Sequence, residues 1–289
     1  KQLCGEMRER LNRAVSKTVE GLSLRGFESH SLRHLKDTEQ ALYPFFVFGG
    51  FVLADTHTHL NHPDLDADRE AVLARASDAG VTRMLVIGYD LVSSRRAAEL
   101  AEEIPGVFAS VGIHPHDASL CDEDALEELS TLACAPGVVA IGEVGLDFYR
   151  NLSPRDAQYR AFEAQISLAH RKKLPLVIHS RDASEEIYDI LLQQAQGLDV
   201  VLHCFSGPPG YARRCLKAGF WLGIGGPLTF KKNTELQEIV RTMPIEQLLL
   251  ETDAPYLAPD PYRGKRNEPA YVRLVAQKAA ELRGIPLED

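Results

Sequence analysis

The sequence predicts an α/β fold, a (β/α)8 (TIM) barrel with an N-terminal extension. From Phe51 onward, short apolar runs alternate with longer amphipathic stretches, which is typical of βα units built on a parallel sheet. The 289 residues also suit one barrel, which usually takes about 250 residues. We therefore expect an extension over residues 1–50 and one barrel domain over residues 51–289.

Eight apolar runs are the candidate strands of this barrel. Most are continuous runs of Val, Ile and Leu rather than strict alternations, as expected for strands that are buried on both faces. They cover residues 51–55, 83–88, 107–112, 138–142, 176–179, 200–203, 220–224 and 247–251. Eight strands with intervening helices predict closure into a barrel.

Two helices are predicted with defined ends. Residues 66–79 carry apolar side chains at helical spacing and stop before Gly80, a residue type that commonly ends helices. Residues 154–172 form the second, with Ser153 expected as its N-cap and Pro154 at the first helical position. These boundaries fix which strand ends face the loops that carry chemistry.

Residues 1–50 have a different character, with a charged, partly amphipathic stretch followed by Ser/His/Arg-rich sequence. We expect either a small helical extension on the bottom of the barrel or an unstructured leader. His30 and His34 lie four residues apart and could present two ligands on one helix face. No acidic or Cys partner lies beside them, so a solvated surface is favoured.

The overall charge restricts the partners. A net charge of −9 and a pI near 5.6 argue against a protein that coats nucleic acid non-specifically, because such binding depends on Lys and Arg. No apolar stretch is long enough to span a bilayer. The five cysteines are odd in number and show no paired spacing, which favours a reducing, cytoplasmic setting without disulfides: Cys4, Cys121, Cys134, Cys204 and Cys215.

The first strand ends in a pattern typical of metal ligands, Asp55-Thr56-His57-Thr58-His59. Residues two apart in a strand face the same side, so Asp55, His57 and His59 share one face and the two imidazoles can converge on one ion. A pair of surface histidines beside a turn is the alternative. That alternative weakens because other strand ends repeat the pattern.

Glu143, His179, His203 and Asp253 each stand where an apolar run gives out. Burying one such group without a partner costs several kcal/mol, and in a barrel these ends form the face that carries active sites. Taken singly, Glu143 or Asp253 could equally cap a helix.

The set as a whole exceeds what one ion needs, which predicts two ions with Glu143 between them. Nitrogen and oxygen ligands allow Zn²⁺, Mn²⁺, Fe or Mg²⁺. Cys204 is left out because it should point away from His203 if the strand continues.

With these residues in place, the chain resembles the TatD-like metal-dependent hydrolases, DNases of the amidohydrolase superfamily, across residues 51–289. The motifs that carry the resemblance start at Asp55 (DTHTH), Gly112 (GIHPH), Gly142 (GEVGLD), His203 (HCFSG), Glu251 (ETDAPY) and Arg263 (RGKRNEP). The resemblance implies that His57, His59 and Asp253 hold one divalent ion, that His179 and His203 hold the second, and that Glu143 bridges them.

Residues around this set are expected to meet the substrate. His114 is expected to contact it, the alternative being a solvated turn before Pro115. Asp147 could orient a ligand histidine. Basic residues in the same face's loops could bind phosphates, although a charge run is usually only a solvated face: Arg181, Lys231, Lys232, Arg263, Lys265 and Arg266.

The predicted function is a metal-dependent deoxyribonuclease, a 3′ to 5′ exonuclease acting on single-stranded DNA or an exposed end. Two ions of Mg, Mn or Zn would activate water, with Asp253 and Glu143 as the catalytic carboxylates. An amide, ester or lactone hydrolase is the main alternative, because the same ligands activate water against acyl carbons. A catalytically silent binding module is a third, which the intact ligand set disfavours.

Overall fold

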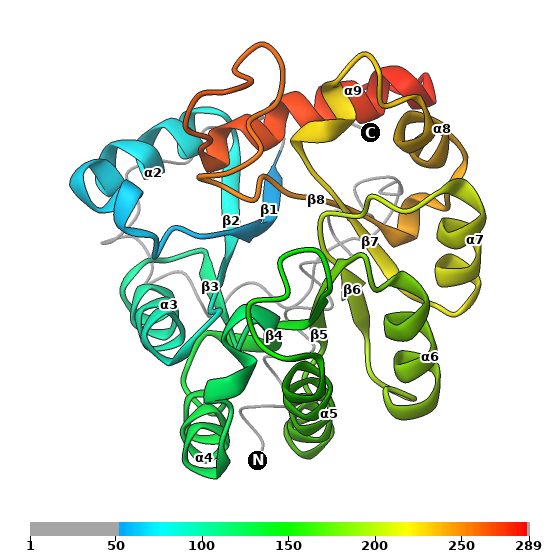
Figure 1. The fold of residues 1–289 in the computed structure, drawn as a ribbon. Helices are drawn as coiled ribbons and strands as arrows, with labels where there is room; N and C mark the ends of the chain where they lie inside the picture. The colour runs from blue at the N-terminus through cyan, green and yellow to red at the C-terminus, as the bar shows by residue number, and fades with distance from the viewer. Residues whose placement is uncertain (1–51, 288–289) are drawn as a thin grey trace, which may run out of the picture.

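The structure is a computed structural model that describes residues 52–287. The strands form an inner ring and the helices surround them (Figure 1). The eight strands pair in parallel in the order of the sequence, from β1 to β8. The predicted (β/α)8 barrel is therefore confirmed. The expected extension, with His30 and His34, lies outside the described residues.

The observed strands lie close to the predicted runs. The largest difference is β4, which continues five residues beyond residue 142 and is buried throughout. The strands are β1 (Leu53–Thr58), β2 (Val81–Ile87), β3 (Val107–Val111), β4 (Val138–Asp147), β5 (Leu176–Arg181), β6 (Val200–Leu202), β7 (Trp221–Ile224) and β8 (Leu248–Leu250).

The helices follow the strands in turn. They are α2 (Arg69–Asp78), α3 (Leu91–Glu103), α4 (Glu123–Leu132), α5 (Arg155–Lys172), α6 (Ser184–Gln194), α7 (Pro209–Lys217), α8 (Thr234–Thr242) and α9 (Val272–Arg283). Short 3₁₀ turns occupy Pro63–Asp68, Pro115–Leu120, Gly226–Thr229, Ile245–Gln247 and Pro269–Tyr271. Among the described residues, no helix is both long and apolar enough to cross a membrane.

Two expected helix starts were wrong. The helix predicted from residue 66 begins as the 3₁₀ turn Pro63–Asp68, and α2 starts only at Arg69. Ser153 does not cap α5, because Pro154 is itself extended (φ −54°, ψ 145°) and occupies the N-cap position. The Ser153 hydroxyl instead donates to the carbonyl of His116 at 2.7 Å, so it joins the loop after β3 to the loop after β4.

Two buried glutamines of α5 fix the ends of β3 and β4. Gln165 accepts a hydrogen bond from the backbone N–H of Ile113 and donates one to its carbonyl, at 2.8 and 3.0 Å. Gln158 accepts from the N–H of Asp147 at 2.8 Å. A buried polar group left unpaired costs about 1–3 kcal/mol. These bonds therefore hold the backbone on either side of the candidate site.

The barrel closes between β1 and β8 mainly through side chains. The carboxylate of Asp55 accepts hydrogen bonds from the backbone N–H and the hydroxyl of Thr252, at 2.9 and 2.5 Å, beside a single backbone bridge between Thr58 and Ala254. Burial raises the pKa of Asp55 to about 8, and the bonds from Thr252 oppose that rise. Asp55 belongs to no group of candidate ligands within reach of one ion among residues 52–287, so its contacts are those of barrel closure.

The domain boundary can be tested by deletion. We expect that removing residues 1–49 leaves a folded protein with an unchanged cooperative melting transition, because the eight strands all lie between Leu53 and Leu250. Thermal unfolding followed by circular dichroism measures this. Insoluble protein, or loss of the cooperative transition, would show that the extension belongs to the core.

Candidate metal centre

The predicted ligands converge at the carboxyl ends of the strands. His57 lies on β1, Glu143 on β4 and His179 on β5. His59 and His203 follow directly after β1 and β6, and Asp253 follows β8 by three residues. Side chains far apart in sequence thus meet at one mouth of the barrel.

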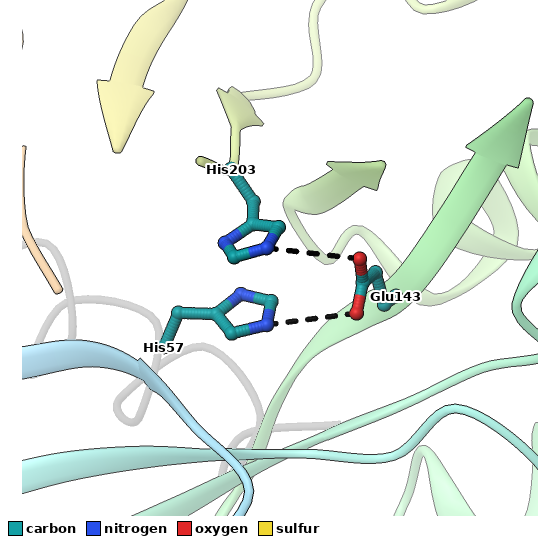
Figure 2. Close-up of side chains that lie close together, drawn as sticks. All are labelled: His57, Glu143 and His203. Carbon is teal, nitrogen blue, oxygen red and sulfur yellow. Dashed lines mark ion pairs between the residues drawn. The ribbon is translucent and has the colours of Figure 1, made fainter. Parts of the chain in front are cut away.

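Glu143 lies at the centre of this group. Its Oε1 is 2.8 Å from Nδ1 of His179 and 3.8 Å from Nε2 of His203, whereas its Oε2 is 3.5 Å from Nε2 of His57. Figure 2 shows His57 and His203 each directed at a different oxygen of this carboxylate. Burial alone would raise the pKa of Glu143, but the charge of His203 and the hydrogen bond from His179 hold it well below its usual range.

His57, His59 and Asp253 form a second group that shares His57 with the first. Oδ1 of Asp253 is 3.2 Å from Nε2 of His59 and 3.8 Å from Nε2 of His57. Asp253 has a left-handed backbone (φ 58°), a conformation that costs a non-glycine residue about 1 kcal/mol or more and persists only where the surroundings hold it. Here the N–H of Asp253 donates to the carbonyl of His57 at 2.9 Å.

His57 is a buried imidazole without a hydrogen-bond partner. Neither of its ring nitrogens is hydrogen-bonded among the described residues, and its ring stacks on that of His203 with centroids 3.4 Å apart. Burial, and then the charge of His203, lower the pKa of His57. It is therefore neutral near pH 7, and the neutral imidazole is the form that binds metal ions.

Two carboxylates lie behind the histidines around Glu143. Nε2 of His179 is 3.1 Å from Oδ2 of Asp147, and Nδ1 of His203 is 2.9 Å from Oε1 of Glu251. In each case the opposite ring nitrogen faces Glu143. A carboxylate in this position fixes the tautomer and orientation of a metal-binding histidine.

Glu251 was missed in the sequence, where it was only the last residue of a strand. The sequence feature that indicated it was a carboxylate ending an apolar run directly before Thr252 and Asp253.

The expected direction of the Cys204 side chain was wrong, because the strand does not continue through it. β6 ends at Leu202, and Cys204 (φ 46°) donates its N–H to Oε1 of Glu251 at 2.7 Å. Cys204 therefore lies within reach of an ion shared with His203 and Glu251.

His114 lies closer to the centre than a solvated turn residue would. Only 8% of it is exposed, and its Nε2 is 3.8 Å from Oε1 of Glu143. Its Nδ1 accepts the backbone N–H of His116 at 3.1 Å, so in the neutral ring the proton is on Nε2. Burial, followed by the charge of His179, keeps the pKa of His114 well below its usual range. The neutral ring of His114 thus directs a hydrogen-bond donor, its Nε2–H, toward the centre.

The donor set fits divalent cations. Three overlapping groups each bring three ligand atoms within 4.8 Å of one another: His57, Glu143 and His203; His57, His59 and Asp253; and His114, Glu143 and His179. Although burial lowers it, the carboxylates of Glu251 and Glu143 raise the pKa of His203 to about 10. A proton thus provides positive charge here, which a cation would replace on binding. His179 and His203, expected on one ion, do not share one such group, but both face Oε1 of Glu143.

Two glycines permit close approach around these side chains. A Cβ at Gly145 would overlap the carbonyl oxygen of His179, and one at Gly223 would overlap the carboxylate of Glu251. Gly145 also has a φ of 143°, which other residues rarely adopt. A larger residue would therefore displace the backbone of His179 at Gly145, or the carboxylate of Glu251 at Gly223.

The predicted phosphate-binding residues differ in their contacts. Arg266 donates to both carboxylate oxygens of Asp68 and to the carbonyl of Asp64, so its guanidinium is already engaged. Arg263 is exposed and lies over the ring of Phe230 at 4.2 Å, and Lys265 is exposed 5.9 Å from the ring of Tyr262. Lys231 and Lys232 are exposed as well.

The sequence profile of the family described as "TatD related DNase" matches residues 54–289. The chain is 44% identical over 239 residues to "Uncharacterized metal-dependent hydrolase YabD" of Bacillus subtilis (strain 168), covering 82% of this chain and 94% of that protein. It is 40% identical over 238 residues to "3'-5' ssDNA/RNA exonuclease TatD" of Klebsiella pneumoniae (strain 342), covering 80% and 90%.

Among solved structures, the crystal structure of YjjV, a TatD homologue from Escherichia coli K12, is similar with a TM-score of 0.77 and 31% identity. The match covers 81% of this chain and 92% of YjjV. The likeness to YjjV agrees with the barrel fold. The chain therefore belongs to the TatD related DNase family.

Proposed function

We propose that this protein is a metal-dependent exonuclease that hydrolyses phosphodiester bonds of DNA from the 3′ end. The observation that carries the proposal is the buried carboxylate of Glu143, whose two oxygens face separate groups of histidines. The relative in Klebsiella pneumoniae, with 40% identity, is named a 3'-5' ssDNA/RNA exonuclease. No observation on the described residues favours the amide, ester or lactone alternative.

We infer two divalent cation positions, one beside each oxygen of Glu143. His57, His59 and Asp253 would hold the first, and His179 with His203 would hold the second. Two cations held by these residues would lower the pKa of a water molecule so that hydroxide is available near neutral pH. They would also offset the negative charge of the phosphodiester transition state. Nitrogen and oxygen ligands suit Mn²⁺, Zn²⁺ or Mg²⁺.

Asp253 is the better candidate for the residue that accepts the proton of the attacking water. Burial raises its pKa, but the hydrogen bond from His59 and the charge of His203 outweigh this and lower it, so Asp253 is ionised at neutral pH. Its side chain is 14% exposed, compared with 5% for Glu143. Glu143 is surrounded by imidazoles, which leaves Asp253 as the carboxylate that solvent can reach.

His114 and the exposed cations are suited to bind the substrate. The Nε2–H of His114 faces the centre and can donate to a non-bridging phosphate oxygen. Because the chain has a net charge of −9, a nucleic-acid strand must be attracted locally. Arg263 and Lys265 are exposed and form no ion pair within residues 52–287, so they can do so, whereas Arg266 is tied to Asp68. A preference for single strands and a cytoplasmic location remain predictions.

The bridging role of Glu143 predicts that Glu143→Gln loses at least one of the two cations. The amide is a weaker ligand than the carboxylate, and it cannot balance the surrounding positive charge. Metal content after dialysis, measured by mass spectrometry, should fall from two ions per chain to one or none. Glu235→Gln, an exposed change on α8, is the control. Two ions retained at the affinity of the parent protein would contradict the bridge.

The proton-accepting role predicts that Asp253→Asn lowers kcat by about 100-fold or more. The amide cannot take the proton, while the fold is kept by the backbone contacts of this segment. Single-turnover cleavage of a 3′-labelled oligonucleotide in Mn²⁺ measures the step, and chelation should abolish cleavage by the parent protein. Asp189→Asn on the exposed face of α6 should be neutral. Near-normal turnover by Asp253→Asn would exclude the role.

Substrate attraction predicts that Arg263→Glu with Lys265→Glu raises the KM for an oligonucleotide about tenfold or more and flattens its salt dependence. Cleavage of a small chromogenic phosphodiester should stay within a few-fold. Arg171→Glu with Lys173→Glu is a control of equal charge and spacing, at the end of α5 that precedes β5. Equal losses on both substrates would mean general damage to the site, and no loss on DNA would favour an acyl substrate.

A further inference from the structure

An exposed tyrosine and an arginine stack on each other beside the candidate centre. Tyr149 lies in the loop between β4 and α5 and is 61% exposed. The Cζ atom of Arg181, at the end of β5, is 4.0 Å from the centroid of the Tyr149 ring. The guanidinium therefore covers one face of the ring, and much of the remainder of the side chain faces solvent.

The strand register sets this stack close to the histidines. Arg181 pairs with Asp147 across β4 and β5, and its carbonyl accepts the N–H of Phe148 at 2.9 Å. His179 and Arg181 are two residues apart on β5, so their side chains leave the same side of the strand about 7 Å apart. The stack thus stands one step outward from His179, at the mouth of the barrel.

Neither side chain of this stack is used by the rest of the described structure. Within residues 52–287, Arg181 has no carboxylate within 4.0 Å, and Tyr149 makes no ring contact with another aromatic residue. The pair formed by Tyr188 and Arg214 is different. Tyr188 packs against Tyr211 and Phe220, and Arg214 binds Glu185, so that pair is part of the structural framework.

We propose that the Tyr149 ring, backed by the guanidinium of Arg181, is a platform on which a nucleobase of the substrate stacks next to the phosphate to be cleaved. This inference rests on the proposed nuclease function and adds the substrate feature that is recognised. Stacking on an aromatic ring accepts every base, because each base has a π face. The charge of Arg181 also attracts the backbone.

The platform selects unpaired bases. A base inside a duplex is covered on both faces by its neighbours, so it can stack on Tyr149 only after it leaves the helix, which costs a few kcal/mol. A base at a frayed end or in a single strand is already available. Tyr149 therefore acts as a specificity residue for single-stranded substrate.

The experiment compares Tyr149→Ala with Tyr149→Phe on two single-stranded oligonucleotides. One carries normal bases, and the other has abasic sites in its 3′-terminal nucleotides. On normal bases, Tyr149→Ala should lower kcat/KM about tenfold, mainly through KM, because one stacked base is lost. Tyr149→Phe keeps the ring and should stay within about twofold to threefold. On the abasic oligonucleotide, the parent protein and Tyr149→Ala should be equal.

Leu152→Ala is the matched control, because it removes a 65% exposed apolar side chain from the same loop without removing a ring. It should leave cleavage of both oligonucleotides unchanged. An equal loss in Leu152→Ala, or an equal loss by Tyr149→Ala on normal and abasic strands, would overturn the platform. So would full activity of Tyr149→Ala on normal bases.

The same assay separates this inference from the proposed function. If the parent protein with Mn²⁺ cleaves neither oligonucleotide, the nuclease proposal fails and the platform fails with it. If the parent protein cleaves both at the same rate as Tyr149→Ala, only the platform fails.

Discussion

The carboxylate of Glu143, buried among four imidazoles, is the constraint to which the rest of the site conforms. Its oxygens lie 2.8 to 3.8 Å from nitrogens of His57, His114, His179 and His203. A buried carboxylate is costly without compensating positive charge. Although burial lowers their pKa values, neighbouring carboxylates raise the pKa of His179 and that of His203, so these two histidines carry the compensating charge. They lie on β5 and directly after β6, whereas Glu143 lies on β4, so this compensation exists only when these strands lie side by side.

Around this carboxylate, orienting contacts decide what each histidine can do. Asp147 and Glu251 occupy the far nitrogens of His179 and His203, leaving the near nitrogens directed at Glu143. The backbone N–H of His116 occupies Nδ1 of His114, which makes His114 a donor. His57 has no such partner among the described residues. The orientation of His179 and His203 and the donor role of His114 thus follow from the group on the opposite side of each of these three rings.

Much of this architecture could be predicted from the sequence, because a polar residue that ends a buried apolar run must lie at the mouth of a parallel barrel. This placed Glu143 and His179 correctly in space. The predictions were wrong or incomplete where a side chain's position depends on the exact end of a strand, or on a partner far away in the sequence. Cys204 and Glu251 meet only because β6 stops at Leu202. Arg266 is engaged by Asp68, 198 residues away in the sequence, which no local pattern indicates.

The central claim is that Glu143 bridges two cations, and anomalous diffraction from crystals grown with Mn²⁺ tests it most directly. The account predicts two anomalous peaks per chain, one beside each oxygen of Glu143, with His57, His59 and Asp253 around one peak and His179 and His203 around the other. A single peak, or two peaks that both avoid the Glu143 carboxylate, would contradict it.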